Sequence, residues 1–241
     1  MQMQVFFKKI WKRFKLLCAL FFAISIFSVI LFRWVPIPLT PLMLIRCTEQ
    51  MFSSGHKIKL NQNWVSIDKI SPNLQLAVVC SEDQNFFQHS GFDFNAIEKA
   101  VEHNKNHKRK RGASTISQQT AKNVFLYDGR NWIRKGFEVY FTFLIEFFWS
   151  KERIMEVYLN VIEFGDGIYG VESASQEFFH TSAQKLTRER AALLASVLPN
   201  PRKFSPITPT SYVRKRQKWI IGQMFNWGGE AKYREESKSK E

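Results

Sequence analysis

The N-terminal part of the chain contains a long, uninterrupted apolar run. Leu16–Phe32 has no charged side chain over 17 residues, and Trp34 and Val35 extend the run past Arg33. At roughly 1.5 Å per residue, a helix of this length nearly matches a hydrocarbon core of about 30 Å. Five cations and no acid lie just before it: Lys8, Lys9, Lys12, Arg13 and Lys15. The pattern predicts a transmembrane anchor over residues 16–35 behind a basic tail over residues 1–15.

The flanking residues decide how this anchor is interpreted. Positive charge on one flank is typical of the cytoplasmic side, so the N-terminus is expected there and the rest of the chain beyond the membrane. A cleaved signal peptide also begins with cations and an apolar run. However, this run exceeds the usual signal-peptide core, and residues 32–36 (FRWVP) lack a small-x-small cleavage pattern. The sequence therefore favours an uncleaved, single-pass signal anchor.

Beyond the anchor the pattern predicts one domain between two accessory segments. Three prolines in Pro36–Pro41 end the anchor, because proline cannot donate a helical hydrogen bond. Residues 36–63 are expected to form a linker and a membrane-proximal segment. Residues 64–229 are expected to form the domain, followed by a charged tail over residues 230–241 that frays after Gly229. Strand-like alternation is scarce, so the domain is expected to be mainly α.

One predicted helix places a carboxylate in an apolar row. This helix is expected to begin at Ser71-Pro72, because serine is a favoured N-cap and proline suits the first helical position. Leu74, Val78 and Glu82 are spaced four apart and therefore share one face. Glu82 continues this apolar row, which favours a functional carboxylate over a solvated one.

Several further helices have recognisable starts or faces. Asp93 and Thr187 are suited to cap helices, and Ser114 is the expected N-cap within the polar segment Gly112–Asn123. In the stretch 130–149, a helix that opens with charged residues continues as YFTFLIEFFW, which is apolar on nearly every face and predicts the central helix of the core. Other predicted elements are a helix over Lys151–Asn160, a glycine-rich loop over Phe164–Gly170, a helix over Val171–Phe179 and an amphipathic segment from Tyr212.

Charge and cysteine content limit the partners. The net charge of +14 indicates an anionic partner. The basic tract 103–111 ends in four consecutive cations and is expected to be a solvated loop that can touch anionic headgroups. It has no interleaved aromatic residue and is expected outside the cytoplasm, so nucleic-acid binding is not expected. Cys18, Cys47 and Cys80 have no metal-ligand spacing and predict no disulfide framework.

Two carboxylates stand in distinctive surroundings. Glu82 belongs to the pair Glu82–Asp83, directly after five small or apolar residues, and apolar surroundings raise the pKa of a carboxyl group. A buried carboxylate with a purely structural role would look the same on this stretch alone. Glu138 follows Arg134 and Lys135 on a predicted helix, where a plain salt bridge is the simpler interpretation. Two carboxylates beside a polar cleft are typical of enzymes that make or break glycosidic bonds.

Cations accompany these carboxylates at Lys122, Arg130, Arg134, Lys135 and Lys151. Such side chains can stabilise a phosphate or pyrophosphate by charge-assisted hydrogen bonds. A hydrolase that releases a sugar has no need for them, whereas glycosyl transfer with a pyrophosphate leaving group does. The hydroxyl and amide side chains of residues 112–123 form either an ordinary polar helix face or a wall that hydrogen-bonds a sugar.

Five segments carry a resemblance to a known family. They are Glu82–Gly91 (EDQNFFQHSG), Gly112–Gln119 (GASTISQQ), Arg134–Glu138 (RKGFE), Lys151–Asn160 (KERIMEVYLN) and Arg190–Pro201 (RAALLASVLPNP). In these segments, and in their order over roughly residues 64–220, the sequence closely resembles the peptidoglycan glycosyltransferases of the lysozyme-like fold, in particular their monofunctional branch. The resemblance implies a mainly α, lysozyme-like domain in the periplasm, behind a single transmembrane helix in the cell inner membrane.

The resemblance also implies roles for individual residues. Glu82 matches the catalytic base, and Glu138 matches the second carboxylate, which assists the donor or holds a divalent cation (Mg or Mn) near the pyrophosphate. Some relatives carry a further cation just before this glutamate, where this chain has Phe137. Family positions that line the donor and pyrophosphate region are occupied by Ser114, Gln118, Gln119, Lys122, Arg130, Arg134 and Lys135. Residues expected to support the site are Asp83, Phe86, His89 and Lys151.

The implied substrate is lipid II, a disaccharide-pentapeptide on polyprenyl pyrophosphate. The implied reaction forms a β-1,4 linkage with inversion and releases polyprenyl pyrophosphate. The sequence requires no cofactor, and the expected partners are the growing glycan strand, membrane lipids and other cell-wall synthesis proteins. A membrane-anchored, lysozyme-like hydrolase or lytic enzyme is the alternative within the same fold, and a basic scaffold with structural acids is the alternative outside enzymes.

Overall fold

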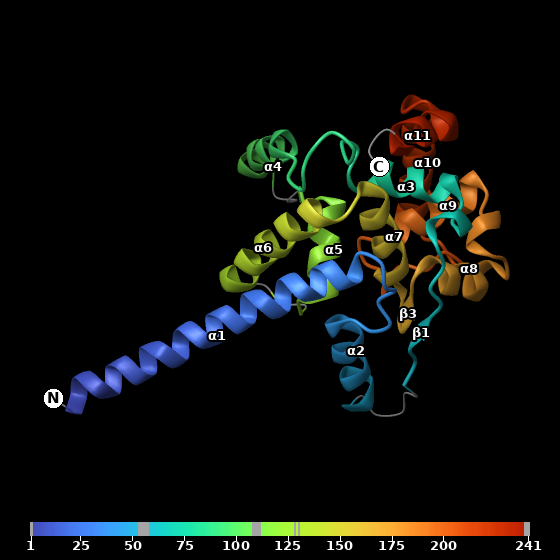
Figure 1. Cartoon of the computed structure of the whole chain (residues 1–241). Coiled ribbons are helices and arrows are strands. Elements are labelled where there is room, and N and C mark those ends of the chain that lie inside the picture. Colours follow the sequence, from blue (N-terminus) through green and yellow to red (C-terminus); the bar gives the residue numbers. More distant parts are fainter. Residues whose placement is uncertain (1, 53–57, 108–111, 128, 130, 239–241) are drawn as a thin grey trace. The chain divides into compact units, whose positions relative to one another are not determined.

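The computed structural model describes residues 2–52, 58–107, 112–127, 129 and 131–238, and it divides into the compact units Met1–Pro36 and Ile37–Glu241. The first unit contains α1 (Gln2–Phe32), of which Phe6–Phe32 is long and apolar enough to cross a membrane (Figure 1). Most of the expected basic tail belongs to this helix. The helix ends before residues 33–35, which the sequence had predicted to be part of the span.

The second unit is mainly helical, as the sequence predicts. Its α-helices are α2 (Pro41–Phe52), α3 (Pro72–Glu82), α4 (Phe94–Asn106), α5 (Ile116–Phe125), α6 (Trp132–Phe148), α7 (Lys151–Val161), α8 (Val171–Phe179), α9 (Arg188–Val197), α10 (Ser211–Asn226) and α11 (Gly229–Lys238). Two short 3-10 helices are η1 (Ile67–Lys69) and η2 (Ala183–Lys185).

Helix α3 is buried on all sides. Every residue from Leu74 to Cys80 is buried, and the helix packs against α9, α10 and α11. A helix enclosed in this way needs an apolar run and not only an apolar stripe. Pro72 occupies the first turn as predicted, but the Ser71 hydroxyl donates to the Leu186 carbonyl at 2.9 Å and does not cap the helix. The hydrogen bond to Leu186 therefore ties the start of α3 to the segment before α9.

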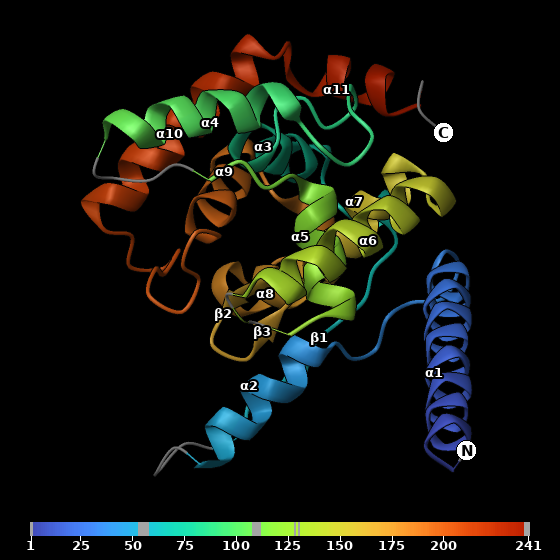
Figure 2. The ribbon, with the colours of Figure 1, turned by 90° about the vertical axis from the view of Figure 1, so that its left-hand side faces the viewer.

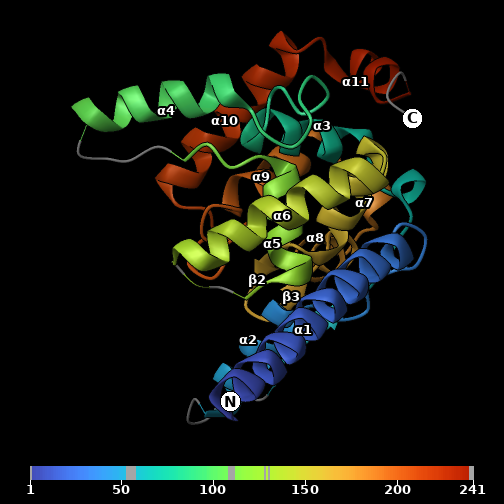
Figure 3. The ribbon, with the colours of Figure 1, turned by 60° about the vertical axis from the view of Figure 1, so that its left-hand side comes forward.

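Helix α6 is not the central helix that the sequence predicts. Phe141 and Ile145 face inward, and the helix lies beside α5 in Figures 2 and 3. On its other side, Trp132, Phe143 and Phe147 are 89%, 61% and 71% exposed. The prediction of an all-round buried helix is wrong, because α5 and α7 cover only one face. The opposite face presents aromatic rings outward.

The predicted helix caps are partly confirmed. Asp93 and Thr187 each accept a hydrogen bond from the backbone N–H three residues later, at 2.8 and 3.4 Å. The predicted cap at Ser114 is wrong by one position. Thr115 caps α5, and its hydroxyl accepts from the Gln118 N–H at 3.2 Å while the Gln118 side chain accepts from the Thr115 N–H at 3.0 Å. This reciprocal pair is a capping box.

A small sheet replaces part of the predicted linker and loop. Strands β1 (Asn61–Gln62), β2 (Glu163–Gly165) and β3 (Ile168–Tyr169) form a sheet in the order β1-β3-β2, with β1 parallel and β2 antiparallel to β3. Gly167 has φ +68°, and a Cβ there would lie 2.3 Å from the Lys59 carbonyl oxygen, so only glycine fits. The structure thus joins residues 61–62 of the expected linker to the expected glycine-rich loop.

The C-terminal segment is ordered further than the sequence predicts. Residues after Gly229 were expected to fray, but α11 continues to Lys238. Tyr233 on this helix is 3% exposed, and its hydroxyl donates to Gln75 on α3 at 3.0 Å. This buried aromatic residue packs the charged tail against the domain.

Candidate active site around Glu82

Glu82 is the last residue of α3. Leu74 and Val78, on the same face, are fully buried, whereas the Glu82 side chain keeps 15% of its surface exposed. The predicted apolar row is therefore confirmed, with a carboxylate at its end. The helix stops at Asp83. This places the Glu82 carboxylate where the buried core of the domain meets accessible space.

Three side chains donate hydrogen bonds to the Glu82 carboxylate. Oε1 accepts from the Ser81 hydroxyl at 3.2 Å and from Arg216 Nη2 at 3.1 Å, and Oε2 accepts from Gln119 Nε2 at 3.1 Å. Gln119 was predicted to lie in the site, but Arg216 was not. Arg216 lies on α10 among several other cations, and no spacing in the sequence connects it to Glu82. Only the packing of α10 against α3 brings the two together.

Burial raises the pKa of the Glu82 carboxyl group, because the charged form loses its hydration. The Gln119 amide, the Arg216 guanidinium and the Ser81 hydroxyl act in the opposite direction, since each interacts favourably with the carboxylate. The net result is a raised pKa. A carboxylate with a raised pKa is a stronger proton acceptor, so this position suits a general base.

A buried tyrosine fixes the orientation of Gln119. The Tyr158 hydroxyl lies 3.2 Å from Gln119 Oε1, and Tyr158 is fully buried. Burial is the main cause that raises the pKa of Tyr158, followed by the nearby Glu82, so the phenol keeps its proton and donates it to the amide oxygen. With its oxygen occupied, Gln119 must present its NH₂ group to Glu82. Tyr158 was not singled out by the sequence analysis, although it lies in a motif that was.

Asp83 connects the end of α3 to neighbouring segments through side-chain hydrogen bonds. Its Oδ1 lies 2.9 Å from His89 Nε2, and its Oδ2 accepts from the Ile116 N–H at the start of α5 at 3.0 Å. Asp83 is 6% exposed. These contacts tie the end of one helix to the beginning of the next, which is consistent with the supporting role expected for Asp83 and His89. Phe86, also expected to support the site, is fully buried beneath them.

The other predicted residues of α5 and of the loop before it differ in their exposure to solvent. Gln118 is 5% exposed, and its side chain belongs to the capping box of α5. It is thus part of the helix start and not exposed for binding. Ser114 is exposed, and Lys122 is half-buried. Arg130, also predicted to bind the pyrophosphate, lies outside the described residues.

Glu138 lies in a separate, strongly charged group on α6. It is 4% exposed, and its carboxylate accepts hydrogen bonds from Arg134 Nη1 at 2.7 Å and from Lys135 Nζ. The predicted salt bridge between Arg134 and Glu138 is confirmed, and Lys135 joins it. The Lys135 side chain is 39% exposed, so this cation remains accessible at the edge of the group.

A third carboxylate forms a group that the sequence analysis missed. Glu146, further along α6, accepts from the Ser117 hydroxyl and from Lys151 Nζ, the latter at 2.7 Å. The Lys151 ammonium also lies 4.7 Å from the centre of the Phe86 ring. Lys151 is therefore engaged inside the domain, linking α6 to α7 and to the residues below Asp83. This placement agrees with its expected supporting role and not with a direct role at a pyrophosphate.

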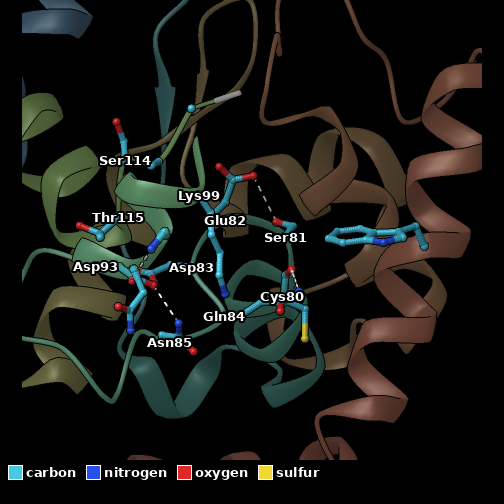
Figure 4. Close-up of a pocket in the computed structure, with 15 residues that line it drawn as sticks. Cys80, Ser81, Glu82, Asp83, Gln84, Asn85, Asp93, Lys99, Ser114 and Thr115 are labelled. Atoms are coloured by element: carbon cyan, nitrogen blue, oxygen red, sulfur yellow. Dashed lines mark hydrogen bonds between the residues drawn. The ribbon is translucent and has the colours of Figure 1, made fainter. Parts of the chain in front are cut away.

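Glu82 opens into a pocket of about 230 Å³. Figure 4 shows Ser81, Glu82, Ser114 and Lys99 around it, with the Lys99 side chain extending through the pocket. Asp93 also lines the pocket, but its carboxylate is held by Asn85 at 2.8 Å and by the start of α4. The pocket thus combines one reactive carboxylate with hydroxyl, amide and ammonium groups, which are the donors and acceptors that a carbohydrate requires.

Most of the chain matches a known protein family and its members. Residues 49–225 match the model of a family described as Transglycosylase. The chain is 56% identical over 217 residues to a biosynthetic peptidoglycan transglycosylase of Bacteroides thetaiotaomicron, an alignment covering 90% of this chain and 87% of the relative. Proteins with the same name from Bdellovibrio bacteriovorus and Shigella boydii are 55% and 50% identical, over 85% and 93% of this chain and 82% and 92% of the relatives.

The chain belongs to the transglycosylase family. The matched region contains both predicted carboxylates, Glu82 and Glu138, and also Arg216. The helical domain is accordingly lysozyme-like, and the protein is a glycosyltransferase of cell-wall synthesis. The expectation drawn from the five sequence segments is confirmed at the level of family, fold class and enzyme class.

The divalent cation expected near Glu138 is not supported by the residues around it. Both Glu138 oxygens already accept hydrogen bonds from cations. Over the described ranges, no group of three or more His, Cys, Asp or Glu side chains is arranged to hold a metal ion. A metal bound by Glu138 would have to displace Arg134 or Lys135. The residues around Glu138 therefore do not fit a metal site.

Proposed function

We propose that this member of the transglycosylase family polymerises glycan strands from lipid II, with Glu82 as its general base. The observation that carries the proposal is the Glu82 carboxylate itself. It is largely buried, has a raised pKa, is held by Gln119 and Arg216, and borders a polar pocket. Asp83 and Asp93 line the same pocket, but their oxygens are taken up by contacts that hold helix ends.

In the proposed reaction, a hydroxyl oxygen of the acceptor sugar attacks the anomeric carbon of the donor sugar. Glu82 accepts the hydroxyl proton as the new C–O bond forms, and the bond between the anomeric carbon and the pyrophosphate oxygen breaks. The polyprenyl pyrophosphate leaves with the electron pair of that bond. Attack from the face opposite the leaving group inverts an α-linked donor into a β-1,4 linkage, and general-base catalysis of this kind contributes about 10²–10⁴-fold.

The α6 cations are the proposed stabilisers of the leaving pyrophosphate. Arg134 and Lys135 together carry two positive charges, and Glu138 neutralises one of them. The group therefore keeps a net charge of about +1, and its geometry is fixed by hydrogen bonds before substrate arrives. Such preorganisation lowers the cost of stabilising charge that develops in the transition state. Lys122 on the neighbouring α5 is proposed to add a further cation.

The substrate carries a long lipid, and two features suit the chain to work at a membrane. Helix α1 provides a candidate span over Phe6–Phe32. On the catalytic domain, the outward face of α6 exposes Trp132, Ile133, Phe143 and Phe147. Apolar rings gathered on one face of a helix are typical of a surface that contacts lipid. We propose that α1 anchors the chain in the inner membrane with its N-terminus in the cytoplasm, and that the α6 face meets the bilayer.

The decisive experiment is incorporation of labelled lipid II into polymer by the purified full-length protein in detergent micelles. We expect polymer together with release of polyprenyl pyrophosphate. The opposite pattern, in which the protein degrades purified cell-wall sacculi and leaves lipid II unchanged, would establish a lytic enzyme and contradict the proposal.

A further inference from the structure

Trp219 lines the same pocket as Glu82, but the proposed proton transfer does not use it. This residue lies on α10 and is 47% exposed. Tryptophan is highly buried on average in folded proteins. Among the side chains that the structure describes, no aromatic or cationic group is paired with this ring. The ring therefore offers an open apolar surface within a mostly polar cavity.

The position of Trp219 on α10 places it next to the catalytic carboxylate. Arg216 is three residues before it and Gln223 four residues after it, so the three side chains share one face of the helix. Arg216 bonds Glu82 at 3.1 Å, and the Gln84 amide donates to Gln223 Oε1 at 3.2 Å. Arg216 and Gln223 are thus both hydrogen-bonded to residues at the C-terminal end of α3. Trp219 lies between these two fixed contacts.

The remaining walls of the pocket are mostly polar. Ser114 contributes an exposed hydroxyl, and Lys99 on α4 contributes an ammonium group that forms no ion pair with any described carboxylate (Figure 4). Pockets for drug-sized ligands are about 300–1,000 Å³. At about 230 Å³ this pocket is smaller, so it suits a single sugar ring.

We propose that Trp219 is a stacking platform that positions the acceptor sugar with its reacting hydroxyl at Glu82. One face of a pyranose ring presents C–H groups that carry partial positive charge, and the face of an indole is the negative side of its quadrupole. A sugar stacked on Trp219 would lie in the pocket that Ser114, Lys99 and Glu82 also line, where these groups can bond its hydroxyls. The inference rests on the proposed function and names the residue that orients the nucleophile.

Binding of a soluble sugar tests this platform directly. The probe is N,N′-diacetylchitobiose, measured by saturation-transfer NMR with the full-length protein in detergent micelles. We expect transfer to the sugar in the wild type and in Trp219→Phe, and loss of transfer in Trp219→Ala. Phe225→Ala is the matched control, because Phe225 is also an exposed aromatic residue of α10 but does not line the pocket. No transfer in the wild type, or equal transfer in Trp219→Ala, would overturn the platform.

Polymerisation of labelled lipid II supplies the second readout. We expect Trp219→Ala to lower kcat/KM about tenfold, the scale of one aromatic contact, with recovery in Trp219→Phe and an unchanged thermal midpoint. Polymer from the wild type combined with undiminished kcat/KM in Trp219→Ala would refute the inference and leave the proposed function standing. Absence of polymer from the wild type would refute the proposed function. The saturation-transfer experiment with N,N′-diacetylchitobiose would still decide whether Trp219 binds a saccharide.

Discussion

The two carboxylates, Glu82 and Glu138, occupy opposite electrostatic surroundings. Glu82 meets one cation, Arg216, together with a neutral amide and a hydroxyl, and burial raises its pKa. Glu138 meets two cations that lie on its own helix, one on each carboxylate oxygen. The first arrangement leaves a carboxylate that gains from accepting a proton. The second uses the carboxylate to hold two cations in place.

This difference divides the proposed chemistry between the two groups. A general base is more effective when its pKa is raised toward the working pH, and burial raises the pKa of Glu82 in that direction. A leaving pyrophosphate needs fixed positive charge, which Arg134 and Lys135 provide. No hydrogen bond joins Glu82 to Glu138 among the described residues, but α5 lies between their surroundings: its Gln119 bonds Glu82, and the helix packs against α6. Each carboxylate can therefore be changed while the other keeps its partners.

Removal of the proton acceptor is expected to have the largest effect. Glu82→Gln keeps the shape of the side chain but cannot accept a proton, so we expect kcat for lipid II polymerisation to fall by about 10²–10⁴-fold. Circular dichroism and thermal unfolding should show a folded protein. Glu102→Gln, at an exposed carboxylate of α4, is the control and should keep wild-type activity. Full activity in Glu82→Gln would remove Glu82 from the role of base.

The same contrast explains what could be predicted from sequence. The Glu138 group was predictable because Arg134, Lys135 and Glu138 are three and four residues apart on one helix, and such pairs meet wherever a helix forms. The Glu82 row was predictable for the same reason. Two other parts of the Glu82 surroundings were not, because Arg216 reaches Glu82, and Tyr158 reaches Gln119, only through packing of α10 and α7. Contacts between distant segments leave no periodic signal in a single sequence.

Elements were mispredicted where local composition was ambiguous. An apolar pattern around all of α6 has two explanations, burial on all sides or an apolar face that is exposed, and the second one holds for Phe143 and Phe147. Gln118 looked like a binding residue, because an amide that caps a helix and one that binds a sugar are the same side chain in the sequence. In the structure the Gln118 side chain takes part in the capping box of α5, and a binding role for it stays a prediction. Neither outcome follows from periodicity alone.

The cation group can be tested by removing its accessible member. Lys135→Ala leaves the Arg134–Glu138 pair intact and deletes one charge-assisted hydrogen bond to the proposed pyrophosphate. Such bonds contribute about 1.5–3 kcal/mol, so we expect kcat/KM to fall roughly 10–100-fold. Lys105→Ala removes an exposed cation of α4 and should change kcat/KM less than twofold. If the two variants lost activity equally, only overall charge would matter, and the assignment of α6 to the leaving group would be wrong.

The Glu82 surroundings can be tested without removing Glu82. The base works only when ionised, so kcat/KM should fall as the pH decreases through the raised pKa of this group. Arg216 lowers that pKa, because a neighbouring positive charge favours the ionised carboxylate. Arg216→Gln should therefore raise the pKa of Glu82 further and move the acidic limb of the profile to higher pH.

The matched control for the pH profile is Arg214→Gln, which removes an exposed cation from the same helix. We expect its acidic limb to coincide with that of the wild type. An equal displacement in both variants would show that the limb follows the net charge of α10 and not the hydrogen bond to Glu82.

The smallest effect is expected on the outward face of α6, which shares a helix with Glu138 but none of its buried contacts. Phe143 and Phe147 stack at 6.2 Å on this face, and Phe143→Ser with Phe147→Ser would remove the apolar surface proposed to meet the bilayer. We expect KM for lipid II in vesicles to rise a few-fold with kcat unchanged, because the α1 anchor still holds the chain at the membrane and the catalytic groups are untouched. Val101→Ser, at an exposed apolar residue of α4, should leave KM unchanged. A fall in kcat instead would mean that this face supports the Glu138 group and has no separate role at the lipid surface.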